Sequence, residues 1–188
     1  VDAQMPAMQP GTVIVDGSTS DPNSTVTLAA KLEASDCHMA DAPLGGTPVQ
    51  AEAGELATMV GASDAVFERI KPVIATWASA IVRIGPSGAG HKMKLLNNFL
   101  SLGYAALYSE ALALSEKVGI STAQFDSVIR GSRMDCGVYQ TIMGYAVEGD
   151  REAHKFTLTN ALKDLQYLES MAAGVALDNP IGNAVKTS

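Results

Sequence analysis

A stripe of polar side chains interrupts the most apolar segment of the chain, at the helical spacing i, i+3, i+4 and i+7: Lys94, Asn97, Asn98 and Ser101. In an α-helix this spacing places all four on one face. A lysine packed against apolar neighbours loses hydration, which lowers its pKa from the usual ~10.4. Such a lysine can donate and recover a proton near neutral pH, which makes Lys94 a candidate general acid and base. Asn98, one turn on, would fix the ammonium or a substrate hydroxyl.

The stretch before this stripe, GPSGAGHKMKLLNN (residues 85–98), is rich in glycine but fits neither common phosphate loop. A P-loop needs GxxxxGK[ST], whereas His91 occupies the lysine position and no hydroxyl follows Lys92. A dinucleotide GxGxxG fails because Met93 stands where the third glycine belongs. We therefore predict a turn from a strand into a helix, with His91 and Lys92 exposed at the helix start.

Composition narrows the functional classes. The net charge of −7 and a pI near 4.8 disfavour nucleic acid or a membrane surface as partner, because either needs a basic face. Two distant cysteines and three scattered histidines show no metal-ligand spacing, and they fit a reducing cytoplasm. The first residues do not match the pattern of a signal peptide, and no apolar run reaches the ~18 residues of a membrane span. The chain begins with Val1 and ends without a helix stop, so we expect a piece of a longer protein.

Elements of two kinds are predicted on either side of residue 85. Short apolar strands are expected at 12–15, 37–44, 56–60 and 80–84, with helices at 25–34 and 64–78 between them and a loop at 45–54. Pro72 predicts a kink or a restart of its helix near Lys71. Such alternation predicts an α/β layer with substantial parallel pairing. Helices follow at 88–118, 121–130, 135–147 and 157–175. The first is apolar almost all round in its first half, so it should be buried by other helices.

With these residues in place, the stretch G-x-x-G-x-G-x-x-x-K-x-x-N-N resembles the catalytic signature of the β-hydroxyacid dehydrogenases, such as 3-hydroxyisobutyrate dehydrogenase. Four further stretches agree with that family in order and spacing: VDGSTSDP (15–22), DAPLGGTPVQAEAGELATMVGA (41–62), EALALSEKVGI (110–120) and FTLTNALKDL (156–165). The resemblance implies that residues 1–85 are the later part of a Rossmann-type NAD(P)-binding domain. Residues 86–188 would be an all-α substrate and dimerisation domain, incomplete at its C-terminus and built on a long interdomain helix.

The resemblance also implies roles for individual residues. Lys94 would exchange a proton with the substrate oxygen while hydride moves to or from NAD or NADP, and Asn98 would orient substrate and lysine. Thr19 would approach the nicotinamide, and Lys163 would close on cofactor and substrate. The substrate pocket would include Gly45, Gly46, Thr47, Asn97 and Ser101.

Two departures from the family shape the functional prediction. Most members read S-G-G where this chain has Gly45-Gly46-Thr47, and no GxGxxG follows a strand here. We therefore expect a fragment of a cytoplasmic homodimeric or homotetrameric NAD(P)-dependent oxidoreductase that interconverts a small β-hydroxyacid and its semialdehyde or keto form. The alternatives are a decarboxylating enzyme like 6-phosphogluconate dehydrogenase, which would need more basic residues, and a non-catalytic helical module whose polar stripe serves packing.

Overall fold

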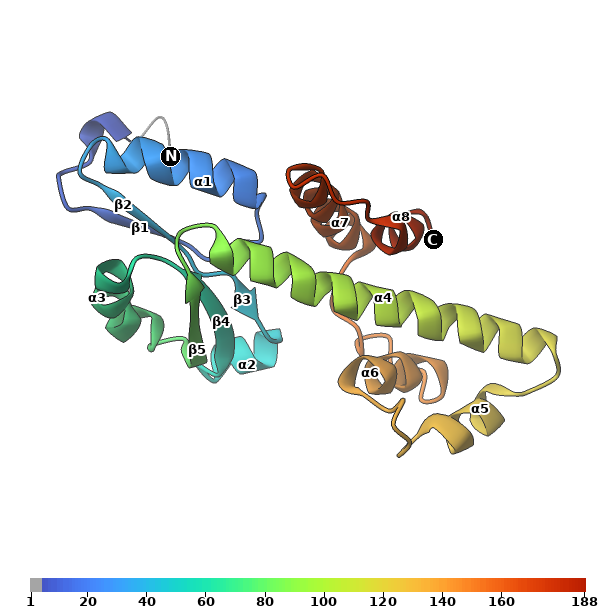
Figure 1. Ribbon diagram of the computed structural model, residues 1–188. Helices are drawn as coiled ribbons and strands as arrows, with labels where there is room; N and C mark the ends of the chain where they lie inside the picture. Colours follow the sequence, from blue (N-terminus) through green and yellow to red (C-terminus); the bar gives the residue numbers. More distant parts are fainter. Residues whose placement is uncertain (1–4) are drawn as a thin grey trace. The chain divides into compact units, whose positions relative to one another are not determined.

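The computed structural model describes residues 5–188, so the first four residues of the predicted domain 1–85 lie outside the described part (Figure 1). A short 3-10 helix, Met5–Ala7, precedes five strands and eight α-helices in this part. The chain forms two compact units. The first comprises the described residues up to Asn97 together with Gln166–Asp178, and the second comprises Asn98–Leu165 together with Asn179–Ser188.

The first unit, here called the sheet unit, is built on a mixed sheet of β1 (Val13–Asp16), β2 (His38–Asp41), β3 (Leu44–Gly45), β4 (Leu56–Gly61) and β5 (Ala78–Gly85). The predicted parallel pairing is found between β1 and β2 and between β4 and β5. In contrast, β4 runs antiparallel to β2 and β3. The pairs Asp41 with Gly61 and Leu44 with Thr58 keep one register, so β2 and β3 are two parts of the single strand expected at 37–44.

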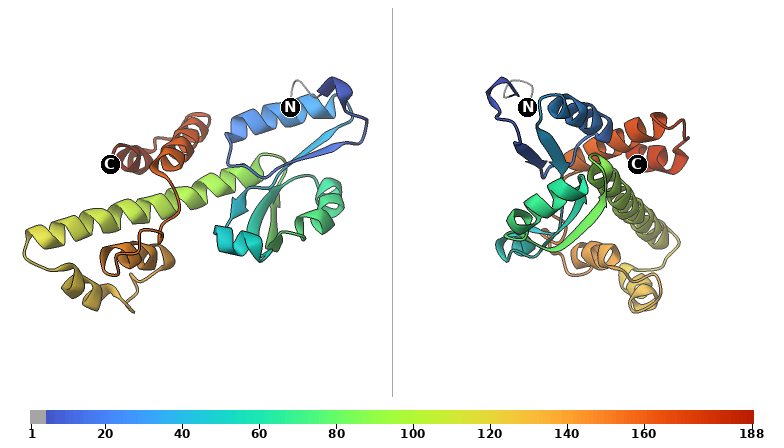
Figure 2. Two further views of the ribbon diagram at one scale, coloured as in Figure 1. Left: turned by 180° about the vertical axis from the view of Figure 1, so that it is seen from behind. Right: turned by 60° about the vertical axis from the view of Figure 1, so that its left-hand side comes forward.

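Helices cover the two faces of this sheet. Along β2, Met39 packs with Leu32 of α1 (Pro22–Glu33), while the next residue, Ala40, packs with Ile70 of α3 (Asp64–Ile74). Successive strand residues point to opposite faces, so α1 and α3 lie on opposite sides of the sheet (Figure 2). Helix α3 runs through Pro72 without a restart and ends at Ile74, so the expected restart near Lys71 is wrong.

One short helix in the sheet unit was predicted as loop. Helix α2 (Pro48–Glu52) starts from Thr47, whose hydroxyl accepts from the N–H of Gln50 while the side chain of Gln50 accepts from the N–H of Thr47. This reciprocal pair is a capping box, and Pro48 at the first helical position also favours a helix start. Local capping therefore explains a helix that is too short to show a hydrophobic period.

The second unit, here called the helical unit, is made of helices only within the described residues. It contains the later part of α4 (Ala89–Lys117), α5 (Thr122–Ile129), α6 (Gly137–Ala146), the start of α7 (Leu158–Ala173) and α8 (Pro180–Thr187). Ser121 caps α5, which was predicted at 121–130. Helix α8 was not predicted, although Asn179 caps it and Pro180 begins it.

The expectation that α4 is buried by other helices is wrong for much of its length. Leu100 and Leu107 are 57% and 65% exposed, and Leu114 is 61% exposed. By contrast, Tyr139 and Met143 of α6 are fully buried. No helix in the part of the chain that the structure describes is long and apolar enough to cross a membrane.

Candidate functional site

Helix α4 carries the predicted polar stripe as one continuous element, and its members differ in burial. Asn98 is buried at 9% exposure, Lys94 and Ser101 are half-buried, and Asn97 is exposed. Lys94 is therefore not sealed inside the protein. A half-buried ammonium can lose part of its hydration and still meet a ligand, as proton transfer requires.

In the helical unit, two of the predicted site residues meet through a third that the prediction left out. The Asn98 Nδ2 donates to Oδ2 of Asp164 at 2.6 Å, and the Lys163 Nζ lies 2.9 Å from Oδ1 of the same carboxylate. The contact of Oδ1 with Lys163 has the distance of an ion pair without the geometry of a hydrogen bond. Asp164 is 3% exposed, so the contacts with Asn98 and Lys163 compensate a buried charge.

This contact also sets the orientation of the Asn98 amide. A carboxylate only accepts hydrogen bonds, so the NH₂ group of Asn98 must face Asp164. The amide oxygen is then directed away from Asp164, where it can accept from an ammonium or a hydroxyl. An oriented acceptor of this kind is what the predicted role of Asn98 requires.

In the sheet unit, the predicted cofactor and substrate residues lie in loops next to strand ends. Thr19 is half-buried in the loop after β1, where the N–H of Ser18 donates to Oδ1 of Asp16 at 2.9 Å. Gly45 ends β3, and Gly46 has a φ of +127° with space for no Cβ, since one would lie 2.9 Å from Leu56. The Thr47 hydroxyl caps α2, so this loop is held by its own backbone contacts.

His91 is fully buried, which contradicts the expectation that it is exposed at the helix start. Its Nε2 lies 3.0 Å from the carbonyl oxygen of Ser18, and its Nδ1 lies 2.8 Å from the hydroxyl of Thr25. Both partners come from the chain before β2, so no local pattern around His91 could have indicated them. Lys92 is exposed, as expected.

The described residues include a loop where a dinucleotide could bind, but they do not include a loop for its phosphates. Ligands of open α/β sheets bind beyond the carboxyl ends of parallel strands, and the loop with Thr19 lies at such an end, after β1. No glycine-rich phosphate loop follows a strand in the described part of the chain. The role of Thr19 on the nicotinamide side stays a prediction. Across residues 5–188 there is also no group of three or more His, Cys, Asp or Glu side chains that could hold a metal ion.

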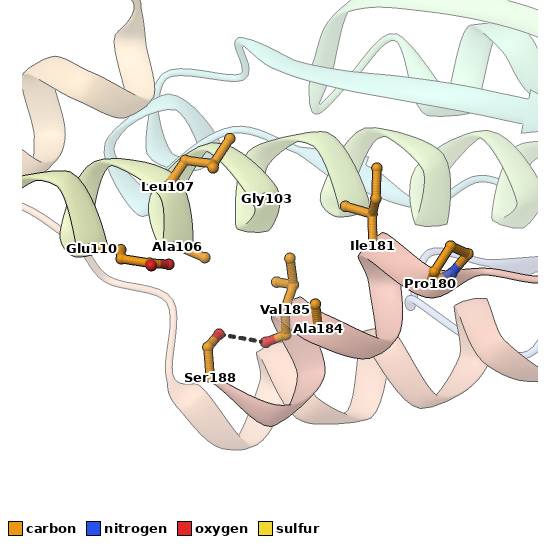
Figure 3. Close-up of a pocket in the computed structure, with 9 residues that line it drawn as sticks. All are labelled: Gly103, Ala106, Leu107, Glu110, Pro180, Ile181, Ala184, Val185 and Ser188. Atoms are coloured by element: carbon orange, nitrogen blue, oxygen red, sulfur yellow. Dashed lines mark hydrogen bonds between the residues drawn. The ribbon is translucent and has the colours of Figure 1, made fainter.

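A separate cavity of about 460 Å³ lies in the helical unit between α4 and α8 (Figure 3). Its lining is largely apolar and includes Leu107, Ile181 and Val185, with Glu110 at one side. None of the predicted site residues lines it. We therefore place the candidate site at the polar stripe and not at this cavity.

Comparison with known families defines the class first. Residues 2–85 match the model of the NAD-binding domain of 6-phosphogluconate dehydrogenase, and residues 88–188 match that of the NAD-binding region of NADP-dependent 3-hydroxyisobutyrate dehydrogenase. Together with the sheet flanked by helices and the helical unit, these matches confirm the predicted Rossmann-type fold followed by helices and the NAD(P) cofactor class. The chain belongs to the β-hydroxyacid dehydrogenase family, as its motifs indicated.

Individual relatives and one solved structure show how similar the chain is to members of this family. The chain is 41% identical over 123 residues to 2-(hydroxymethyl)glutarate dehydrogenase of Eubacterium barkeri, covering 65% of the chain and 41% of the relative. It is 29% identical over 177 residues to L-threonate dehydrogenase of Escherichia coli, covering 94% and 58%. The structure of Mycobacterium tuberculosis 3-hydroxyisobutyrate dehydrogenase with L-serine is similar, with a TM-score of 0.87 at 27% identity, covering 97% and 65%. The chain thus spans about half the length of the curated relatives it matches.

Proposed function

We propose that this chain is part of an NAD(P)-dependent oxidoreductase that interconverts a small β-hydroxyacid and its semialdehyde or keto form. The observation that carries the proposal is the buried contact of Asp164 with both Asn98 and Lys163, because it joins two predicted site residues that lie 65 positions apart in the sequence. A packing network alone would not need a lysine that remains 38% exposed at one end of the contact.

The names of the relatives support the substrate class. 2-(Hydroxymethyl)glutarate, L-threonate, 3-hydroxyisobutyrate and the L-serine present with one solved structure each carry a hydroxyl on the carbon β to a carboxylate. Oxidation at that carbon gives an aldehyde or ketone. A site for such molecules needs an acid/base group at the hydroxyl oxygen and polar groups for the carboxylate.

The proposed roles follow from these needs. Bound NAD(P) supplies or accepts the hydride. Lys94 holds the proton that enters or leaves the substrate oxygen, and the amide oxygen of Asn98 orients the ammonium or the hydroxyl. Asn97, Ser101 and the loop Gly45–Thr47 line the substrate pocket, whereas Thr19 and Lys163 contact the cofactor.

The proposal also covers the domain organisation, the location and the oligomeric state. We assign residues 1–85 to a Rossmann-type cofactor domain and 86–188 to a substrate and dimerisation domain. The exposed leucines of α4 fit a homodimer or homotetramer, and the two free cysteines fit a reducing cytoplasm.

The test compares Lys94→Ala with Lys92→Ala, which removes an exposed lysine two positions earlier on the same helix. General acid/base catalysis contributes about 10²–10⁴-fold, so Lys94→Ala should lower turnover of a β-hydroxyacid by at least ~10²-fold. Its affinity for NAD(P), measured by calorimetry, should change by less than about threefold, because Lys94 acts at the substrate. Lys92→Ala should keep both properties. Near-normal turnover of Lys94→Ala would support the non-catalytic helical module instead.

A further inference from the structure

A buried carboxylate of the sheet holds the start of helix α4. Asp41, at the end of β2, is fully buried and accepts two hydrogen bonds from the backbone around the first turn of α4. The N–H of Gly88 donates to Oδ1 at 2.6 Å, and the N–H of His91 donates to Oδ2 at 2.7 Å. The first N–H groups of a helix have no partner within it and attract negative charge. Asp41 thus caps α4 from a strand about fifty residues earlier in the sequence.

The side chain of His91 joins the same turn to two other elements. A carbonyl oxygen only accepts, so Nε2 carries the hydrogen that is donated to Ser18 at 3.0 Å. On the other side of the ring, Nδ1 lies 2.8 Å from the hydroxyl of Thr25 in α1. The ring also lies near two carboxylates, 3.9 Å from Asp41 and 4.0 Å from Asp16. One residue of α4 therefore contacts the loop after β1 and the helix that follows it.

Two glycines make these contacts sterically possible. A Cβ on Gly90 would overlap the carbonyl oxygen of Met59 and lie 2.8 Å from the carbonyl oxygen of Asp41. A Cβ on Gly61 would overlap the carboxylate of Asp41. At Gly90, the start of α4 is thus packed directly on the backbone of β2 and β4.

We propose that Asp41 and His91 are positioning residues for the catalytic lysine. They fix the first turn of α4, and with it Lys94 three residues after His91, relative to the loop Asp16–Thr19. This proposal rests on the proposed function, because it assigns the proton transfer to Lys94 and the nicotinamide side to Thr19. Every contact in it lies inside the sheet unit.

Two variants test the proposal in the intact enzyme, with one matched control. Asp41→Asn keeps the shape of the side chain but places an NH₂ group against one of the two backbone N–H donors. Thr25→Val removes only the hydroxyl that reaches His91. Thr27→Val is the control, since its hydroxyl also donates to the carbonyl four residues back but lies on the exposed side of α1 without contacting His91.

Misplacement of a catalytic group by ~1 Å can cost ~10²-fold in rate. We expect kcat, counted per bound NAD(P), to fall about 10- to 100-fold in Asp41→Asn and about 3- to 10-fold in Thr25→Val. The KM for the hydroxyacid should change by less than about threefold, and Thr27→Val should match the unsubstituted protein. In Asp41→Asn, hydrogen exchange at the amides of Gly88 and His91 should also accelerate, which reports the cap without reference to activity.

Unchanged kcat per bound cofactor in both variants would overturn the proposal, because a purely structural role lowers only the amount of folded enzyme. An equal loss in Thr25→Val and Thr27→Val would overturn it as well. The proposed function is decided separately by Lys94→Ala. If that variant is inactive while Asp41→Asn and Thr25→Val turn over normally, the function stands and the positioning role fails.

Discussion

The close approach of α4 to the sheet can be tested by adding a single methyl group. Gly90→Ala places a Cβ against the carbonyl oxygens of Met59 and Asp41, neither of which can rotate away because both belong to strand backbone. Gly103→Ala, on the same helix, places its Cβ where no atom beyond the adjoining residues and the local helix backbone lies within 4 Å. The pair compares one chemical change in a crowded and in an open position of α4.

The expected effects have opposite signs. Replacing glycine by alanine inside an exposed helix stabilises a protein by roughly 0.5–1 kcal/mol, so Gly103→Ala should gain about that much. Overpacking costs about 1–3 kcal/mol, so Gly90→Ala should lose most of this amount even after its helix-propensity gain. The two variants should therefore differ by about 2–3 kcal/mol. With a urea m-value of ~2 kcal/mol/M, this separates their midpoints by more than ~1 M.

Urea unfolding followed by two signals would measure this difference. The single tryptophan, Trp77, packs against the core of the sheet unit, so its fluorescence reports the unit that contains Gly90. Far-UV circular dichroism is dominated by the helices and also reports Gly103. A Gly90→Ala midpoint equal to or above that of the unsubstituted protein would refute the close packing of α4 on the strands.

Two further predictions concern the helical unit. Asp126 accepts from Arg130 and from the hydroxyl of Tyr139, and these contacts, that of Arg130 first, hold its carboxyl pKa below the usual range. The pKa of Asp126 is lower in the folded than in the unfolded protein, so its stabilisation is complete above the unfolded value of ~3.9 and is lost as the pH falls through the folded value. Asp126→Asn should therefore melt at a lower temperature than the unsubstituted protein at pH 7, as followed by circular dichroism, and this difference should narrow in acid. A difference in melting temperature that does not depend on pH would contradict the prediction. Cys136 precedes α6 without a side-chain capping hydrogen bond, but the backbone N–H of Tyr139 favours the thiolate and lowers the pKa of the Cys136 thiol. Iodoacetamide should therefore label Cys136 well before Cys37, which is 1% exposed. Equal labelling rates, measured by mass spectrometry, would show that burial and thiolate formation do not control the reactivity of these cysteines.

The sequence was most informative where a strong local pattern coincided with a long element. The strand at 56–60 and the helix at 88–118 were predicted within a few residues of β4 and α4. Helices α2 and α8 were missed because they are short and no hydrophobic period was recognised in them. Their start signals were nevertheless present in the sequence, as Thr47-Pro48 and Asn179-Pro180.

Site residues were harder to predict when their partners were distant. Lys94 and Asn98 stand out because their spacing is local. Adjacent residues on a helix do not face each other, so the sequence gives no sign of a pair between Lys163 and Asp164. The Nζ of Lys163 nevertheless lies 2.9 Å from the Asp164 carboxylate. His91 looked like an exposed residue because nothing in its neighbourhood shows that Thr25 and Ser18 cover it.

The structure also gives a physical reason why the glycine-rich stretch before α4 is not a phosphate loop. A helix start binds phosphate through its unpartnered N–H groups and its positive dipole end. At the start of α4, the N–H groups of Gly88 and His91 already donate to the carboxylate of Asp41, which is fully buried beneath them. The protein thus supplies its own anion at this helix start. The same glycines that suggest phosphate binding allow the helix to approach the sheet closely enough for Asp41 to occupy that position.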